Sequence, residues 1–177
     1  MKLPLAYYGN PILRKKCTRV ETIDDDIPRL VKDMVDTLIE HNGLGLAAPQ
    51  VNRSLRLFIT AVPKEKKDGE WLPGKLRVFI NPTIVSTSTD LNTRSEGCLS
   101  IPTLYEEVTR PVKVIVRATD LEGNTFEEEF SDLEARCILH ENDHINGVLF
   151  IDRVRGQARK DLEPKLKEIK KKYEQSN

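Results

Sequence analysis

Apolar residues recur at helical spacing in three parts of the chain, of which residues 25–41 are the first. In that stretch they fall at intervals of three and four, which places them on one face of a helix. Asp24, Asp25 and Asp26 open the stretch, where carboxylates favour the positive end of the helix dipole. We therefore predict an amphipathic helix over 25–41, with an apolar face formed by Ile27, Leu30, Val31, Met34, Val35, Leu38 and Ile39.

Apolar, largely branched or aromatic residues mark four shorter stretches, at 55–62, 76–85, 111–119 and 125–130. In residues 111–119 apolar and polar side chains alternate, which is typical of a half-buried strand. Gly123-Asn124 separates the last two stretches and favours a hairpin turn between them. We predict strands in all four stretches, a solvated hairpin excursion over 63–75 and a Ser/Thr-rich loop over 86–95.

A second helix is predicted from Ser131, because Ser131 and Glu134 have the spacing of a capping box. Gly147 supplies a stop signal at the other end. Apolar residues at helical spacing lie between them, at Leu133, Cys137 and Ile138.

The third helical pattern covers residues 155–177, where Leu162, Leu166, Ile169 and Tyr173 share one face. Residues 153–177 hold nine Lys or Arg against four Asp or Glu, so the opposite face is basic. We favour a terminal amphipathic helix that docks its apolar face and leaves the charged face in water. A contact of the basic face with ribosomal RNA is a second hypothesis.

The chain has 177 residues and a formal net charge of zero, so we expect one domain and no DNA partner. Cys17, Cys98 and Cys137 form no even disulfide framework, which favours a reducing cytosol. The first residues lack a secretory apolar region, and no stretch approaches the length of a membrane span. We therefore expect a cytoplasmic protein without a membrane partner.

Two of the three histidines stand four residues apart, in His140-Glu141-Asn142-Asp143-His144. On a helix, positions i and i+4 share one face, so both imidazoles can reach one metal ion. Glu141 can project toward the same space as a proton acceptor. A catalytic metal site needs a third protein ligand and an open position for water. Cys98 could supply the ligand, although alone it would be either a buried structural cysteine or a nucleophile.

A glycine-containing stretch follows the first helix, at Gly43-Leu44-Gly45-Leu46-Ala47-Ala48-Pro49-Gln50. Two glycines one residue apart permit a tight turn and close approach of another group. The pattern is not a phosphate-binding fingerprint, because no strand precedes it and no third glycine follows. It remains open whether the stretch is a helix cap leading into a buried connection or part of a site.

Three stretches together resemble the motifs of peptide deformylases, in the same order and at similar separations. They are residues 43–50, Glu96-Gly97-Cys98-Leu99-Ser100 and the His140–His144 motif. The opening residues, the length and the terminal helix also resemble the bacterial type. One departure is Leu139, where the family usually has glutamine. The resemblance implies an α+β fold, in which antiparallel β-sheets pack around a central metal-binding helix with one helix near each terminus.

The resemblance implies a hydrolase that removes the N-formyl group from formylmethionine on newly made polypeptides and releases formate, in the bacterial cytosol or an organelle of bacterial origin. It implies one divalent metal held by Cys98, His140 and His144. Fe²⁺ is the expected native ion, with Ni²⁺ or Zn²⁺ as replacements.

In the expected mechanism, a metal-bound water attacks the formyl carbon with Glu141 as general acid and base. Gln50 and the Leu99 backbone N–H would stabilise the oxyanion. Methionine would enter a pocket lined by Leu44, Leu133 and Cys137, and the substrate backbone would approach over Gly45 and Gly97.

Two other hypotheses use the same histidines. A zinc endopeptidase would take its third ligand from downstream, for which Glu163 is a candidate. A structural metal site in a binding module would be closed by a fourth protein ligand.

Overall fold

The computed structural model describes residues 1–177 and contains three α-helices, three 3₁₀ turns and seven strands. The helices are α1 (Asp26–Glu40), α2 (Asp132–Ile145) and α3 (Gly156–Lys172). The 3₁₀ turns are η1 (Pro11–Arg14), η2 (Ala48–Val51) and η3 (Phe150–Arg153). The strands are β1 (Gly45–Ala47), β2 (Leu57–Glu65), β3 (Trp71–Thr87), β4 (Leu91–Cys98), β5 (Ile101–Pro111), β6 (Lys113–Thr119) and β7 (Thr125–Ser131).

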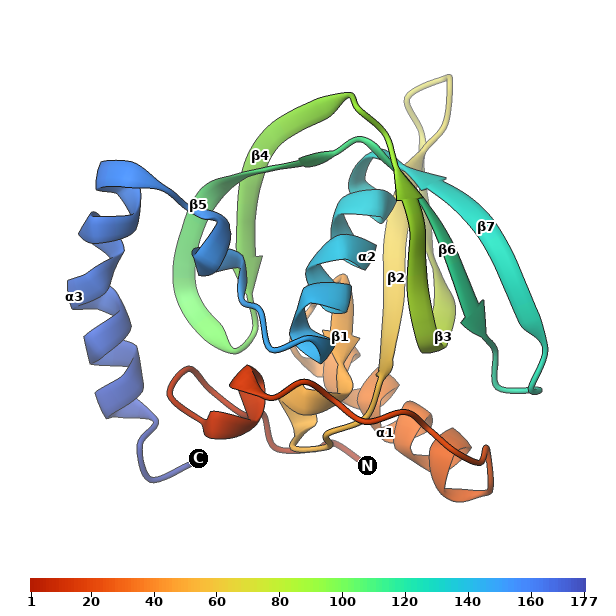
Figure 1. Ribbon diagram of the computed structural model, residues 1–177, viewed down its shortest axis with the longest axis horizontal. Coiled ribbons are helices and arrows are strands. Elements are labelled where there is room, and N and C mark those ends of the chain that lie inside the picture. Colours follow the sequence, from red (N-terminus) through yellow and green to blue (C-terminus); the bar gives the residue numbers. More distant parts are fainter.

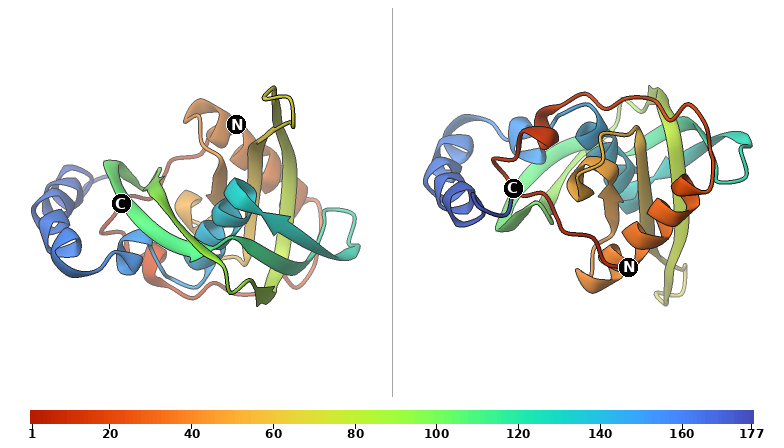
Figure 2. Two further views of the ribbon diagram at one scale, coloured as in Figure 1. Left: turned by 90° about the horizontal axis from the view of Figure 1, so that it is seen from above. Right: turned by 90° about the horizontal axis from the view of Figure 1, so that it is seen from below.

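The strands form two antiparallel sheets with α2 between them (Figure 1). The larger sheet has the order β1-β2-β3-β6-β7, and the smaller is the β4–β5 ribbon. The views from above and below in Figure 2 place α1 and α3 on the outside of this arrangement. The α+β fold expected around a central helix is confirmed.

The face of α2 toward the larger sheet is apolar. Its Ala135, Ile138 and Ile145 are fully buried in one cluster with Phe58 and Phe79. The two aromatic rings stack with centroids 4.8 Å apart. Full burial of an Ile or Phe side chain contributes about 1.5–3 kcal/mol, so this face anchors the helix on the sheet.

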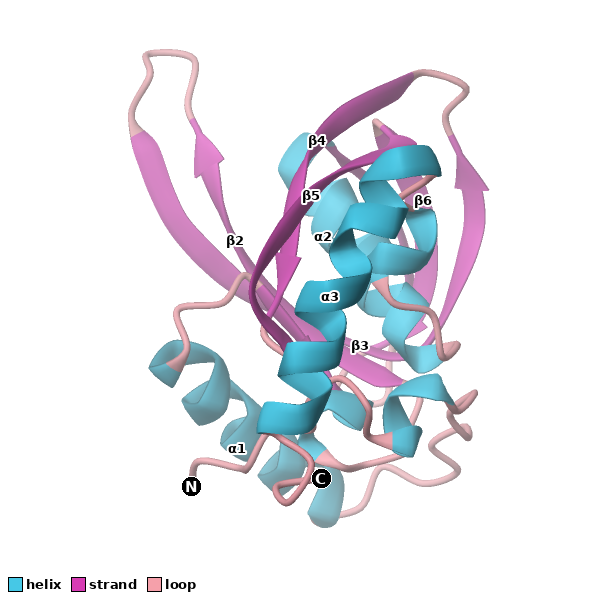
Figure 3. Cartoon of the chain, turned by 90° about the vertical axis from the view of Figure 1, so that its left-hand side faces the viewer, coloured by secondary structure: helices cyan, strands magenta, loops and turns pink.

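The predicted helices at 25–41, from Ser131 and at 155–177 all form, within one to five residues of their expected ends. Helix α3 packs Leu162, Leu166 and Ile169 into a cluster that includes Leu104 and Val108 of β5. Figure 3 shows α3 in front of β4 and β5, on the outside of the molecule. The charged residues of α3 are exposed or half-buried, as the amphipathic pattern predicts. No helix combines the length and hydropathy needed to cross a membrane.

The prediction of a loop over 86–95 was wrong, because β4 begins at Leu91, and strand β5 was not foreseen. Most β4 residues are exposed or half-buried, since the strand belongs to a ribbon with only one neighbour. The alternation of apolar and polar residues that marks a half-buried strand is therefore weak in β4.

The excursion over 63–75 is a solvated hairpin, as predicted: β2 runs to Glu65, which pairs with Trp71, the 57% exposed first residue of β3. One further prediction needs correction. The capping box does not form: the Ser131 side chain makes no cap hydrogen bond, and Glu134 pairs instead with Lys64 at 3.1 Å. Asp132 has a φ of 55°, which redirects the chain from β7 into α2.

Candidate metal centre

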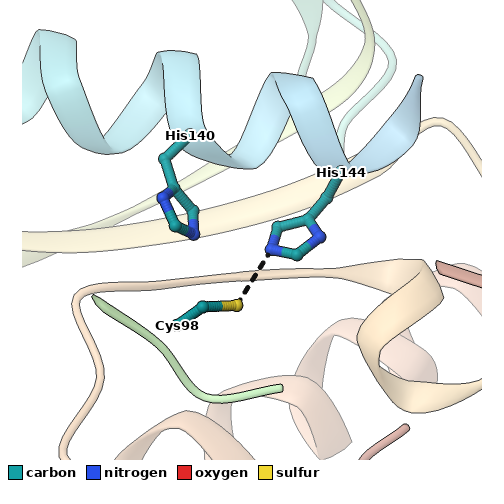
Figure 4. A group of neighbouring side chains, drawn as sticks. All are labelled: Cys98, His140 and His144. Carbon is teal, nitrogen blue, oxygen red and sulfur yellow. Dashed lines mark hydrogen bonds between the residues drawn. The ribbon is translucent and has the colours of Figure 1, made fainter. Parts of the chain in front are cut away.

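Cys98, His140 and His144 come together from separate elements. Cys98 is the last residue of β4, and the histidines lie one turn apart on α2. Their ligand atoms all lie within 4.8 Å of one another. Cys98 Sγ and His144 Nε2 are 3.3 Å apart, and both imidazoles point toward the sulfur (Figure 4). The predicted juxtaposition of thiol and imidazoles is therefore present.

The donor set suits a transition metal. One thiolate and two imidazoles are ligands for zinc, iron or nickel, and three protein ligands leave a position open. No fourth His, Cys, Asp or Glu joins the group, in contrast to a closed structural site. Glu163, the third ligand in the endopeptidase hypothesis, lies on α3 and pairs with Arg159 at 2.9 Å.

Glu96 orients His140. His140 Nδ1 donates to Glu96 Oε1 at 2.9 Å, which leaves Nε2 as the nitrogen that can ligate. Burial opposes ionisation of Glu96, but hydrogen bonds from His140 and Arg110 outweigh it and lower its pKa to about 2. Burial likewise opposes protonation of His140, but its hydrogen bonds to Cys98 and Glu96 raise its pKa well above the usual value. Metal binding at Nε2 would displace the proton that this nitrogen carries in the protonated imidazole.

A buried cluster of charges extends from Glu96. Arg110 donates to both carboxylate oxygens of Glu96, at 2.6 and 3.0 Å, and to Asp143 at 3.0 Å. Arg136 donates to Glu96 at 2.5 Å, and Arg153 donates twice to Asp143 at 2.7 Å. Sequence reasoning assigned none of these residues a role. The signal for Glu96 was available, because ligating histidines usually donate to a carboxylate.

His144 has a different environment from His140. Burial lowers the pKa of His144 well below the usual value, so its ring is neutral, the form that binds metals. Its Nδ1 is buried and no protein atom accepts a hydrogen bond from it. The orientation of His144 therefore rests on packing and on the contact of its Nε2 with Cys98 Sγ.

Glu141 is 2% exposed and lies in the same cavity as Cys98 and His140. Burial, with the charges of Glu96 and Asp143 adding to it, raises its pKa to about 7. A cation on the three ligands would lower this pKa, because an opposite charge favours the carboxylate. A Cβ at Gly45 would lie 2.9 Å from Glu141 Cγ and 2.7 Å from Cys137 Sγ, so a larger residue there would collide with both.

Gln50 is held beside the sulfur. Its Oε1 accepts from the Ala47 backbone N–H at 2.9 Å, which aims Nε2 at Cys98 Sγ, 3.6 Å away. Nε2 also donates to Ser100 Oγ at 3.2 Å. Ser100 is fully buried and was not considered from the sequence. These contacts hold the amide of Gln50 beside the Cys98 thiol.

A cavity of about 560 Å³ opens next to the three ligands. All five residues expected to contact substrate line it, together with Leu99: they are Leu44, Gly45, Gly97, Leu133 and Cys137. Burial raises the pKa of the Cys137 thiol well above its usual value, so this side chain adds no charge to the cavity wall. Sequence reasoning missed three tyrosines that also line the cavity, Tyr7, Tyr105 and Tyr173.

Comparison with known proteins decides the family. A sequence model of the polypeptide deformylase family matches residues 2–160. The chain belongs to this family. A peptide deformylase from Nitrobacter hamburgensis is 45% identical over 142 residues, which are 80% of this chain and 81% of the relative.

Solved structures agree with this assignment. A plant peptide deformylase is 38% identical and superimposes with a TM-score of 0.89, covering 99% of this chain and 92% of its own. A class I type b peptide deformylase from Acinetobacter baumannii, bound to Met-Ala-Ser, is 34% identical with a TM-score of 0.81, covering 87% of this chain and 99% of its own.

The family resemblance and the prediction of an enzyme are thus confirmed. Peptide deformylases are metal-dependent hydrolases that remove the formyl group from formylmethionyl peptides. The departure at Leu139 lies away from the ligands' hydrogen bonds. Leu139 is half-buried and packs against the apolar cluster that contains Phe58 and Phe79, where a hydrocarbon side chain is well accommodated.

Proposed function

We propose that this chain removes the formyl group from the N-terminal formylmethionine of newly made polypeptides, with its centre at Cys98, His140 and His144. The observation that carries the proposal is that their ligand atoms lie within 4.8 Å of one another beside a cavity containing Glu141 and Gln50. Fe²⁺ is the proposed native ion, and Ni²⁺ or Zn²⁺ could replace it. A divalent ion held there would polarise the formyl oxygen and lower the pKa of a water.

Glu141 is proposed to move the proton. Its carboxylate lies one residue from His140 and faces the space beside Gly45. There it would accept a proton from the attacking water and pass it to the leaving amine of methionine. Proton transfer by a positioned side chain contributes typically ~10²–10⁴-fold to rate.

Gln50 and Leu99 are proposed to stabilise the developing oxyanion. The contacts of Gln50 with Ala47, Cys98 and Ser100 keep its amide N–H group oriented before substrate binds. Leu99 follows Cys98 directly and lines the same cavity, so its backbone N–H is the proposed second donor. Removal of one such donor costs ~10²–10³-fold in turnover.

The methionine side chain is proposed to lie among Leu44, Leu133 and Cys137, which line the cavity. The substrate backbone is proposed to approach over Gly45 and Gly97, which line the same cavity. The Met-Ala-Ser peptide in the Acinetobacter baumannii relative supports a substrate of this kind, because it begins with the residue left after deformylation.

The domain organisation and the cellular location of the protein are also proposed. Residues 1–177 would act as a single domain, in a bacterial cytosol or an organelle of bacterial origin. The packing of α3 onto β5 supports inclusion of residues 155–177 in that domain. The basic face of α3 remains available for a ribosome contact, which is the lesser hypothesis for this helix.

The test is formate release from formyl-Met-Ala-Ser. We expect Glu141→Gln to reduce kcat by about 10²–10⁴-fold. Glu163→Gln is the matched control, because Glu163 is a glutamate on α3 outside the cavity. Equal rates for wild type and Glu141→Gln would contradict the assigned proton transfer.

Metal binding is tested separately, by metal analysis of Cys98→Ala and Glu163→Ala. We expect only Cys98→Ala to lose the ion. Loss in Glu163→Ala alone would support the endopeptidase hypothesis instead. For the ion itself, Fe²⁺ predicts that activity falls on prolonged aeration, and unchanged activity would count against iron.

A further inference from the structure

Two tyrosines from opposite ends of the chain meet at the cavity. Tyr7 belongs to the N-terminal segment, and Tyr173 caps the C-terminal end of α3. Their rings stack with centroids 3.8 Å apart and an interplanar angle of 14°. Both side chains are half-buried, and both line the cavity that contains Cys98 and Glu141. Helix α3 thus contributes a residue to the site.

Hydrogen bonds hold this pair in a defined place. The Tyr8 backbone N–H donates to Ser100 O at 2.8 Å, which ties the N-terminal segment to the turn after Cys98. The Tyr7 backbone N–H donates to Asn177 Oδ1 at 2.9 Å, beside the end of α3. Figure 2 shows this end of α3 next to the N-terminal segment. The tyrosine pair is therefore positioned relative to the reacting centre.

Another part of the cavity wall has an unusual backbone. Cys98 pairs with Ile101, but Gly97 pairs with Tyr105, so residues 102–104 bulge from the β4–β5 ribbon and line the cavity. Thr103 has a φ of 66°, which is uncommon for a β-branched residue. Such strained conformations cluster at ligand sites. The bulge shapes this part of the cavity at an energetic cost.

The surface offered by the pair is aromatic and neutral. Burial, with a smaller effect of Tyr173, raises the pKa of Tyr7, so its phenol remains protonated. Lys172 Nζ lies 5.4 Å from the centroid of the Tyr173 ring, so a cation already lies over that ring. A neutral ring can stack on the tyrosines or meet them edge to face.

We propose that Tyr7 and Tyr173 bind an aromatic side chain of the substrate peptide, at a residue downstream of the formylmethionine. The proposal rests on the proposed function, since it concerns the same cavity and substrate. It makes Tyr7 and Tyr173 specificity-determining residues and gives α3 a role in substrate selection that is independent of a ribosome.

The experiment uses formyl-Met-Ala-Ala-Ala and three variants with Phe at position two, three or four. We expect wild type to prefer Phe over Ala at position three or four by roughly three- to tenfold in kcat/KM, the size of one aromatic pair contact. Tyr173→Ala and Tyr7→Ala should lose this preference, whereas Tyr173→Phe should keep it.

Tyr8→Ala is the matched control. Tyr8 adjoins Tyr7 and packs on the same apolar cluster as Tyr173, but it does not line the cavity. It should keep the preference for Phe. The rate on formyl-Met-Ala reports whether each variant retains an intact centre, and Tyr173→Leu replaces Tyr173→Ala if the latter fails to fold.

Two results would overturn the inference. One is equal kcat/KM for Phe and Ala at every position in wild type. The other is a preference for Phe that survives in both Tyr7→Ala and Tyr173→Ala. Failure of wild type to release formate from any peptide, formyl-Met-Ala included, would reject the proposed function itself and the inference with it.

Discussion

The two faces of α2 are built in opposite ways. Toward the five-stranded sheet, Ala135 and Ile138 belong to one apolar cluster with Phe58 and Phe79. Toward the β4–β5 ribbon, α2 makes ionic contacts that centre on Glu96, which is 8% exposed. One helix is thus held by apolar burial on one side and by charge pairing on the other.

The two faces therefore have different roles: the apolar face stabilises the fold, and the ionic face positions His140. Apolar burial is favourable and tolerant of small changes of shape. A buried ion cluster pays a large desolvation penalty, so hydrophobic residues of similar volume often replace it without loss of stability. The cluster around Glu96 is therefore better explained by its contact with His140 than by a contribution to the folding free energy.

The largest expected effect is on the ionic side, from Arg110→Met. The variant leaves Glu96 and Asp143 without their shared buried cation, which should lower the free energy of unfolding by about 3–5 kcal/mol. Urea unfolding measures the change. Arg94→Met, at an exposed site on β4, should stay within about 0.5 kcal/mol of wild type. A loss below 1 kcal/mol for Arg110→Met would show that the buried carboxylates do not need this cation, which would contradict the ionic description of this face.

The next effect is on metal affinity, from Glu96→Gln. The amide keeps the size of the side chain but removes the charge that orients His140, so affinity should fall about 10- to 100-fold. Competition with a chelator measures it. Glu107→Gln, an exposed change on β5, should leave affinity unaltered. An unchanged affinity in Glu96→Gln would assign the cluster to stability alone.

A smaller effect is expected on the apolar side, from Ile138→Val. Loss of one buried methylene should cost about 0.5–1.5 kcal/mol in the free energy of unfolding. Metal affinity should not change, because the side chain points away from the ligands. A joint loss of stability and affinity would show that the two faces are coupled.

The smallest effect is expected from Leu139→Gln, which introduces the residue usual in the family. Half-burial against the apolar cluster predicts a loss of roughly 0.5–1 kcal/mol, with formate release unchanged. Leu139→Met is the control, since it preserves volume and polarity. A gain of activity in Leu139→Gln would indicate that this position acts on the centre.

Local chemistry made part of the site predictable. The positions of His140, Glu141 and His144 follow from the period of a helix, which a short stretch of sequence reveals. The three motifs together identified Cys98 and Gln50, and the structure places both beside the histidines. The β4–β5 ribbon was missed because its strands lack a strong alternation of apolar and polar residues.

The sequence by itself determined the three helices, most strands of the larger sheet and the candidate ligands, because helical and strand periods are properties of neighbouring residues. Only the tertiary structure decided that Glu96, Arg110 and Asp143 form one cluster and that Tyr7 stacks on Tyr173. Those contacts join residues far apart in the chain. Packing and the need to pair buried charges decide which residues make these contacts. Neither produces a periodic pattern in the sequence.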